Sequence, residues 1–153
     1  MIAYRPKKSL LTSGAEVLVN PVNTLGVSGA GLALAFKTAY PTNYDYYRAY
    51  CRKGRLKPGQ IFAFRADEDT VILNVATKDH WRDPSDMATI ETAINAIVNY
   101  VAVNKPYSIA VPALGCGLGG LDPDLVIPKI EEAFFDMDFP GLVLLCVLED
   151  YNE

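Results

Sequence analysis

The chain has few residues of the kinds that build metal centres and disulfide frameworks. Among 153 residues there is one histidine, and the three cysteines, Cys51, Cys116 and Cys146, are far apart. An odd number of scattered cysteines without metal-ligand spacing supports neither a disulfide framework nor a zinc site. We therefore expect reduced thiols, and activity that needs neither a metal nor a cofactor.

Long hydrophobic runs and an excess of positive charge are also missing. No stretch approaches the roughly 18 consecutive apolar residues of a membrane span, and the N-terminus shows no hydrophobic signal segment. We therefore expect a cytoplasmic protein without membrane contact. The formal net charge of -4 argues against a general duplex-DNA binder, which needs many Lys and Arg contacts to phosphates, but it is compatible with a local cationic patch.

Two glycine-rich loops, residues 26–31 (GVSGAG) and 115–120 (GCGLGG), carry most of the information that is present. Each follows an apolar strand-like run and precedes a helical pattern. Because glycine has no Cβ, successive backbone N–H groups can converge on an anion, and the N-terminus of the next helix adds attraction. One such loop is about as often an ordinary turn, but two in matching context indicate a diphosphate ligand.

Neither loop matches the common nucleotide-binding motifs. The first has the spacing G-x-x-G-x-G instead of the dinucleotide pattern G-x-G-x-x-G, and no acidic ribose-binding residue follows in the usual place. No Gly-Lys-Ser/Thr follows the glycines, so nothing positions a γ-phosphate or a magnesium ion. We expect a ligand whose phosphates are bound and not hydrolysed.

The hydrophobic pattern predicts one α/β layered domain. The order of elements places both glycine loops at the C-terminal ends of neighbouring strands, and residues 74–82 (NVATKDHWR) reach the same edge. The strands around an acidic turn at 67–69 form a hairpin, and Ser85 or Asp86 caps the longest helix. Strands are expected at 2–4, 16–21, 61–65, 71–75, 108–112 and 142–148, and helices at 30–39, 43–52, about 87–101 and 122–135.

Three segments in order resemble macrodomains, the ADP-ribose-binding fold: VNPVNTLGVSGAGLALAFKTAYP, TKDHWRDPS and SIAVPALGCGLGGLDPDLV. Within that superfamily the chain is similar to the branch that contains terminal ADP-ribose glycohydrolase and the DarG antitoxins. The resemblance covers nearly the whole chain. It implies a single macrodomain over residues 1–153, with three α/β/α layers around a mixed central sheet.

The resemblance also implies where ADP-ribose would bind. The backbone at Ser9 and Leu10 would contact the adenine, where many macrodomains have an aspartate in place of Ser9. Asn23 would contact the distal ribose, and the two glycine loops would enclose the diphosphate and that ribose. The implied loop contacts are Ser28, Gly29, Ala30, Gly31, Leu32, Gly115, Cys116, Gly117, Leu118, Gly119 and Gly120.

Lys78 is the predicted catalytic residue, because in this branch the catalytic lysine follows a threonine at the end of a central strand, as Lys78 follows Thr77, which is itself an implied ADP-ribose contact. A lysine amine that desolvation or a cationic neighbour keeps partly neutral can attack the anomeric carbon of the distal ribose and displace the attached group. Without this context, a lysine is by default a solvated surface cation. The general base stays open: terminal ADP-ribose glycohydrolase has an aspartate where this chain has Gly119, and Asp79, His80, a phosphate or water are candidates.

The similarity to antitoxins implies a substrate, single-stranded DNA with ADP-ribose on thymidine, and a DarT-type toxin as partner. Residues 44–57 interleave tyrosines with cations, which suits a single strand through stacking and phosphate attraction. An equally acceptable interpretation is a helix whose tyrosines pack inward and whose basic end complements the helix dipole. The candidate DNA contacts are Arg52, Lys53, Arg55, Trp81 and Arg82.

Three functions therefore compete. The first is a monomeric DNA ADP-ribosyl glycohydrolase that needs no metal and acts as an antitoxin. The second is a module that binds ADP-ribose without turnover. The third is a hydrolase of small derivatives, such as ADP-ribose 1″-phosphate or O-acetyl-ADP-ribose.

Overall fold

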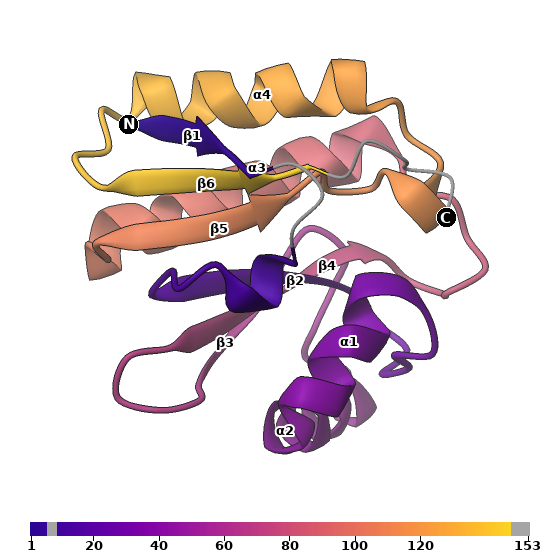
Figure 1. Cartoon of the computed structure of the whole chain (residues 1–153). Coiled ribbons are helices and arrows are strands. Elements are labelled where there is room, and N and C mark those ends of the chain that lie inside the picture. The colour runs from indigo at the N-terminus through magenta and orange to yellow at the C-terminus, as the bar shows by residue number, and fades with distance from the viewer. Residues whose placement is uncertain (6–8, 148–153) are drawn as a thin grey trace.

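Six strands form one mixed sheet in the computed structural model, which describes residues 1–5 and 9–147. The strand order is β1-β6-β5-β2-β4-β3, and every neighbouring pair is parallel except β3 and β4. The C-terminal ends of β5, β2 and β4 therefore share one edge of the sheet (Figure 1). The strands are β1 (Ile2–Tyr4), β2 (Val17–Asn23), β3 (Ile61–Arg65), β4 (Val71–Lys78), β5 (Ser108–Pro112) and β6 (Leu142–Cys146).

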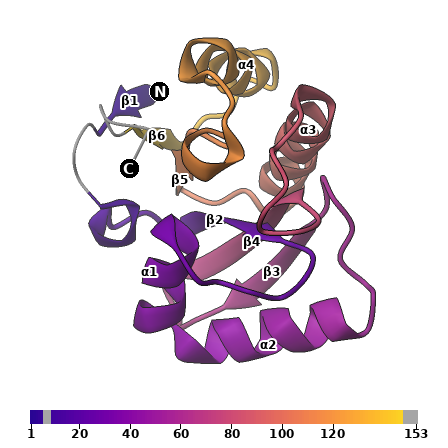
Figure 2. The ribbon, with the colours of Figure 1, turned by 90° about the vertical axis from the view of Figure 1, so that its right-hand side faces the viewer.

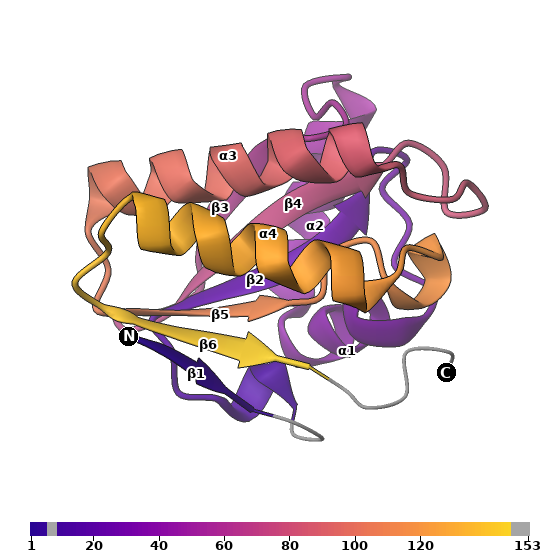
Figure 3. The ribbon, with the colours of Figure 1, turned by 90° about the horizontal axis from the view of Figure 1, so that it is seen from above.

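Helices cover both faces of the sheet. On one face lie α1 (Gly31–Ala39) and α2 (Pro41–Arg52), and on the other lie α3 (Met87–Asn104) and α4 (Pro123–Asp136) (Figure 2). Helices α3 and α4 run side by side across the sheet (Figure 3). Two short 3-10 turns, Leu10–Thr12 and Gly117–Gly119, lie in the loops. This is the expected three-layer arrangement.

The alternation of side chains along β2 assigns its residues to the two faces. Val17 and Val19 pack with the α3–α4 side, and Leu18 packs with Phe36 of α1 on the other side. Because both faces are covered, β4 is buried along its whole length except at Lys78, its last residue. The predicted stripe on α3 is confirmed, since Ile90, Ile94, Ile97 and Val101 are all buried.

The expected elements are confirmed, with informative differences at their ends. Helix α2 begins at Pro41, before the expected residue 43, because a proline that ends one helix suits the first position of the next. Asp86, not Ser85, caps α3, and its carboxylate accepts from the Thr89 amide at 2.8 Å. Strand β4 continues to Lys78, beyond the expected end at residue 75. Leu148, the expected end of the last strand, lies outside the described residues.

Candidate functional site

Three segments meet at the edge formed by the C-terminal ends of β5, β2 and β4. We call them the first glycine loop (residues 26–31, after β2), the second glycine loop (115–120, after β5) and the rim segment (79–86, after β4). Because β2 lies between β5 and β4, its loop lies between the other two. The predicted meeting of these segments at one edge is confirmed.

Direct contacts join the three segments. The amide of Thr24, which lies between β2 and the first glycine loop, donates to the carbonyl oxygens of Lys78 at the end of β4 and of Asp79 in the rim segment, each at 3.1 Å. The Ser85 amide donates to the carbonyl of Gly119 at 3.0 Å, which joins the rim segment to the second glycine loop. A Cβ placed on Gly31 would lie 3.9 Å from Leu118 Cδ1, so the two glycine loops also approach each other.

Lys78 stands where the ladder between β2 and β4 becomes irregular. Val22 pairs with Ala76, but Asn23 pairs with Lys78, so Thr77 is an extra residue in β4. Bulges of this kind often re-aim a side chain beside an active site. The Lys78 side chain is half-buried, and this desolvation lowers the pKa of its amine, while the nearby Asp83 carboxylate acts in the opposite direction.

Asn23 organises the first glycine loop through its side chain. Its Oδ1 accepts from the amides of Leu25, Gly26 and Val27 at 3.1–3.3 Å, and its Nδ2 donates to the Val27 carbonyl at 2.8 Å. The Tyr47 hydroxyl donates to the Asn23 carbonyl at 2.6 Å. One Nδ2 hydrogen of Asn23 remains for a ligand, so contact with the distal ribose stays a prediction.

The helices that follow the two glycine loops differ in how their N-termini are satisfied. No side chain caps α1, whose N-cap is Ala30, so its first-turn N–H groups are open to an anion. Helix α4 is capped by Asp122, whose carboxylate accepts from the Asp124 amide at 2.9 Å. The first glycine loop is therefore followed by a helix without a side-chain cap, and the second by a capped one.

At two positions of the second glycine loop, a side chain would have to displace neighbouring side chains. A Cβ on Gly115 would lie 2.8 Å from Ile90 Cδ1, and one on Gly119 would lie 2.6 Å from Ser85 Oγ. Gly119 is the position that the resemblance matches to an aspartate of terminal ADP-ribose glycohydrolase, and a side chain there would have to displace that of Ser85. The Ser85 hydroxyl is buried and has no hydrogen-bond partner in the described part of the chain.

The candidate general bases are held by internal hydrogen bonds. Thr24 Oγ1 donates to Asp79 Oδ1 at 2.6 Å, and the Arg82 amide donates to His80 Nδ1 at 3.0 Å. Asp79 keeps a second carboxylate oxygen, whereas Nδ1 of His80 already accepts a hydrogen bond. Both remain candidates.

Cys116, in the second glycine loop, is buried, which raises the pKa of its thiol to about 11. The thiol is therefore protonated and not a nucleophile.

The remaining predicted ligand contacts differ in their exposure and in what they can offer a ligand. Leu10 has a buried side chain and offers only its backbone, while Ser9 is exposed and its hydroxyl accepts from the Leu11 amide at 3.2 Å. Thr77 is buried and donates to the Val22 carbonyl at 3.4 Å. In the first glycine loop Ser28 is buried, and Leu32, just after the loop, is half-buried. The exposed predicted contacts of the two loops are Gly29, Ala30, Gly31, Gly117, Leu118 and Gly120.

The tyrosines of residues 44–57 mostly pack inward, as the alternative interpretation predicts. Tyr47 is 1% exposed, Tyr44 donates to the Gly26 carbonyl at 3.1 Å, and Tyr50 stacks on Phe62 with ring centroids 4.5 Å apart. Tyr46 is the exposed member. The candidate DNA contacts Arg52, Lys53, Arg55, Trp81 and Arg82 all lie at the surface.

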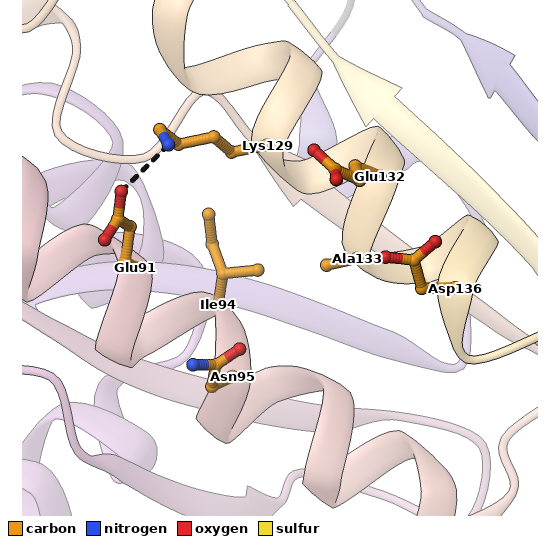
Figure 4. Close-up of a pocket in the computed structure, with 7 residues that line it drawn as sticks. All are labelled: Glu91, Ile94, Asn95, Lys129, Glu132, Ala133 and Asp136. Atoms are coloured by element: carbon orange, nitrogen blue, oxygen red, sulfur yellow. Dashed lines mark ion pairs between the residues drawn. The ribbon is translucent and has the colours of Figure 1, made fainter.

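A separate pocket lies between α3 and α4, away from the predicted ligand contacts (Figure 4). Its volume is about 290 Å³, and Lys129 Nζ crosses it to Glu91 Oε1 at 2.8 Å. None of the residues predicted to bind ADP-ribose lines it.

Among residues 1–5 and 9–147, no three His, Cys, Asp or Glu side chains lie together as a metal site. No helix of this part of the chain is long and apolar enough to cross a membrane.

Sequence reasoning missed two residues that shape the site. Tyr47 holds Asn23 from 24 positions away, and Ser85 fills the space beside Gly119. A tyrosine within an amphipathic helix and a serine before a helix cap carry no signal of these roles. Both roles depend on which elements pack together.

The fold and the edge geometry define an α/β/α domain with converging glycine loops and an open helix N-terminus, the arrangement of domains that bind phosphorylated ligands. The family model of the Macro domain matches residues 19–130, and the chain belongs to the macro domain family. The expected macrodomain fold is thereby confirmed.

Relatives and solved structures narrow the similarity within this family. The DNA ADP-ribosyl glycohydrolase of Thermus aquaticus is 41% identical over 128 residues, which are 82% of this chain and 36% of that protein. The macrodomain of Mycobacterium tuberculosis DarG is 36% identical with a TM-score of 0.90, covering 95% of this chain and 97% of that chain. Thermosipho africanus DarTG in complex with ADP-ribose is 31% identical with a TM-score of 0.80, and the match covers 90% of this chain and 39% of that chain. The chain thus spans little more than a third of the Thermus relative.

Proposed function

We propose that this chain is a DNA ADP-ribosyl glycohydrolase in which Lys78 is the nucleophile. The observation that carries the proposal is the position of Lys78, half-buried at the end of β4, on the edge of the sheet from which the two glycine loops also leave. Burial lowers the pKa of this amine, which enlarges its neutral, nucleophilic fraction at physiological pH. The name of the Thermus aquaticus relative supports DNA as the substrate class.

In this proposal ADP-ribose lies along the C-terminal edge of the sheet. The diphosphate binds the backbone of the glycine loops and the open N-terminus of α1. The adenine lies near Ser9 and Leu10, and the distal ribose lies near Asn23 and Lys78. The Thermosipho africanus structure, which holds ADP-ribose, supports this choice of ligand.

The proposed reaction has two steps. The neutral Lys78 amine attacks C1″ of the distal ribose, the bond from C1″ to the base nitrogen breaks, and the base leaves with the electron pair. The extra proton on the attacking nitrogen passes to the departing nitrogen. Water then adds to C1″ of the lysyl adduct, the bond to Nζ breaks, and ADP-ribose and free Lys78 are released. A DNA ADP-ribosyl transferase, the reaction class of DarT-type toxins, must supply the substrate.

The direct test is release of ADP-ribose from a single-stranded oligonucleotide modified on thymine. We expect release by the wild type, loss of release in Lys78→Ala, and retained ADP-ribose binding in that variant. Lys129→Ala is the matched control, because it removes a lysine from the α3–α4 pocket and should release ADP-ribose normally. Tight ADP-ribose binding without release by the wild type would contradict the proposal and favour a binding module or a small-molecule hydrolase.

A further inference from the structure

The rim segment presents an aromatic and cationic surface three residues beyond Lys78. Trp81 is 48% exposed, and the guanidinium carbon of Arg82 lies 4.6 Å from the centroid of its ring. The His80 ring lies against the same indole, with centroids 5.2 Å apart. We call Trp81 and Arg82 the rim stack. Since three residues span at most about 11 Å, the rim stack lies close to the predicted reaction centre.

Hydrogen bonds fix the turn that carries the rim stack. The Asp83 amide donates to the His80 carbonyl at 3.0 Å, and the His80 amide donates to Asp83 Oδ2 at 3.3 Å. The Arg82 amide donates to His80 Nδ1 at 3.0 Å. A surface that is ordered before the ligand arrives loses little conformational entropy on binding.

The carboxylates of the rim segment accept hydrogen bonds from within the protein. Asp79 accepts from Thr24 at 2.6 Å, Asp83 accepts from the His80 amide, and Asp86 accepts from the amide and hydroxyl of Thr89 at 2.8 and 3.0 Å. These bonds use part of the acidic surface next to the stack. Trp81 and Arg82 are both exposed, so a ligand can reach the stacked pair that their side chains form.

Helix α2, the other predicted aromatic and cationic segment, offers little ring surface to an unpaired base. The tyrosines Tyr44, Tyr47 and Tyr50 are engaged inside the protein, so helix α2 contributes cations and the single exposed ring of Tyr46. Tyr46 itself packs near Phe64, with ring centroids 5.2 Å apart. The rim stack is the aromatic surface that adjoins Lys78 in the chain.

We propose that the rim stack holds a nucleobase of the single-stranded DNA that carries the ADP-ribose. This inference rests on the proposed function and adds its specificity: a stacked base distinguishes DNA-linked ADP-ribose from small derivatives. Aromatic and arginine side chains both stack on bases, and an arginine beside the strand also attracts its phosphates. A base within a duplex is already stacked on its neighbours, so the surface favours single strands.

The sequence supplies a site-specific probe, because Trp81 is the sole tryptophan. We expect an unmodified single-stranded oligonucleotide to quench the intrinsic tryptophan fluorescence of the wild type, and the same sequence as a duplex to leave it unchanged. Fluorescence that is unchanged by saturating single strand, with binding measured independently by anisotropy, would overturn the proposal. This experiment needs no turnover, so its outcome is independent of whether the proposed glycohydrolase reaction occurs.

Substitution provides the second measurement. We expect Trp81→Ala to weaken single-strand affinity by about 10- to 100-fold, in line with the usual loss of one base stack, and Trp81→Phe to retain most of it. The affinity for free ADP-ribose should be unchanged in both. Tyr107→Ala, which removes an 88% exposed ring just before β5, is the matched control and should bind like the wild type. Equal loss of affinity for DNA and for ADP-ribose in Trp81→Ala would show a structural role and overturn the proposal.

Discussion

The amine of Lys78 experiences two opposing influences. Partial burial at the end of β4 disfavours the charged form and lowers the pKa, and the carboxylate of Asp83 favours the charged form and raises it. Burial is the larger of the two effects. The fraction of neutral amine at a given pH therefore depends on the burial of Lys78 at the end of β4 and on the carboxylate of Asp83 in the rim segment.

Replacing Asp83 by Asn should shift the pH dependence of the reaction. Without the carboxylate, the pKa of Lys78 falls further, so the neutral amine forms at lower pH. The rise of kcat/KM with pH should then occur at lower pH than in the wild type, because the rate follows the deprotonated nucleophile. The asparagine still offers an oxygen to the His80 amide.

The measurement is a pH profile of kcat/KM for both proteins. Asp45→Asn, which removes an exposed carboxylate from α2, serves as the control and should leave the profile unchanged. A profile of Asp83→Asn that shifts to higher pH would contradict this account of the amine.

Between elements, the first glycine loop depends on helix α2 as well as on strand β2. The Tyr47 hydroxyl reaches from α2 to the backbone of Asn23, and Tyr44 reaches the carbonyl of Gly26. Burial raises the pKa of Tyr47, so its hydroxyl stays protonated and donates throughout the physiological range. The first glycine loop is therefore held by Asn23 at the end of β2 and by Tyr44 and Tyr47 of α2.

Tyr47→Phe should destabilise both the fold and the first glycine loop. The substitution keeps the ring and leaves the buried Asn23 carbonyl without this donor, which costs about 1–3 kcal/mol of unfolding free energy. We also expect weaker binding of ADP-ribose, because the loop is less well ordered. Denaturant unfolding and calorimetric titration measure the two effects, and Tyr46→Phe at an exposed position is the control. An unchanged unfolding free energy would contradict the role assigned to Tyr47.

The elements of this fold were predictable where local pattern decides them. The 3.6-residue stripe on α3 and the hairpin around residues 67–69 follow directly from hydrophobic periodicity and turn composition. The extra residue at Thr77 and the fit of Ser85 against Gly119 were not predictable. A register shift and a steric contact arise only when separate segments pack together.

The same distinction between predictable and unpredictable features applies to the candidate site. The two glycine loops and Lys78 could be placed at one edge from the order of strands and from the family resemblance. The burial of Tyr47 beneath a loop could not be predicted, whereas Trp81 was named as a candidate DNA contact and is exposed. Their residue types are compatible with either environment.

For the molecule as a whole, charge is unevenly placed. The formal net charge is -4, yet Arg52, Lys53 and Arg55 are exposed together at the C-terminal end of α2. Cations there complement the partial negative charge of the helix end. The same cations can attract phosphates of a DNA strand, and the two roles differ in their response to salt.

Replacing Arg52, Lys53 and Arg55 together by Gln should weaken the salt dependence of single-strand binding. Each lost phosphate contact lowers the slope of log K against log salt by about 0.7. We expect the slope to fall by about 2, with ADP-ribose affinity unchanged. Replacement of Arg65, Lys105 and Lys129 by Gln removes the same charge elsewhere and is the control. Equal slopes in the two triple variants would show that the α2 cations do not contact DNA.

The central claim is that Lys78 forms a covalent bond to the distal ribose, and trapping that bond tests it most directly. An adduct on C1″ opens to an imine, which borohydride reduces to a stable amine. Mass spectrometry of the wild type, reduced during turnover of an ADP-ribosylated oligonucleotide, should show ADP-ribose attached to the peptide that contains Lys78, and Lys78→Ala should show none. Release of ADP-ribose by Lys78→Ala at the wild-type rate, without any adduct in either protein, would contradict the account.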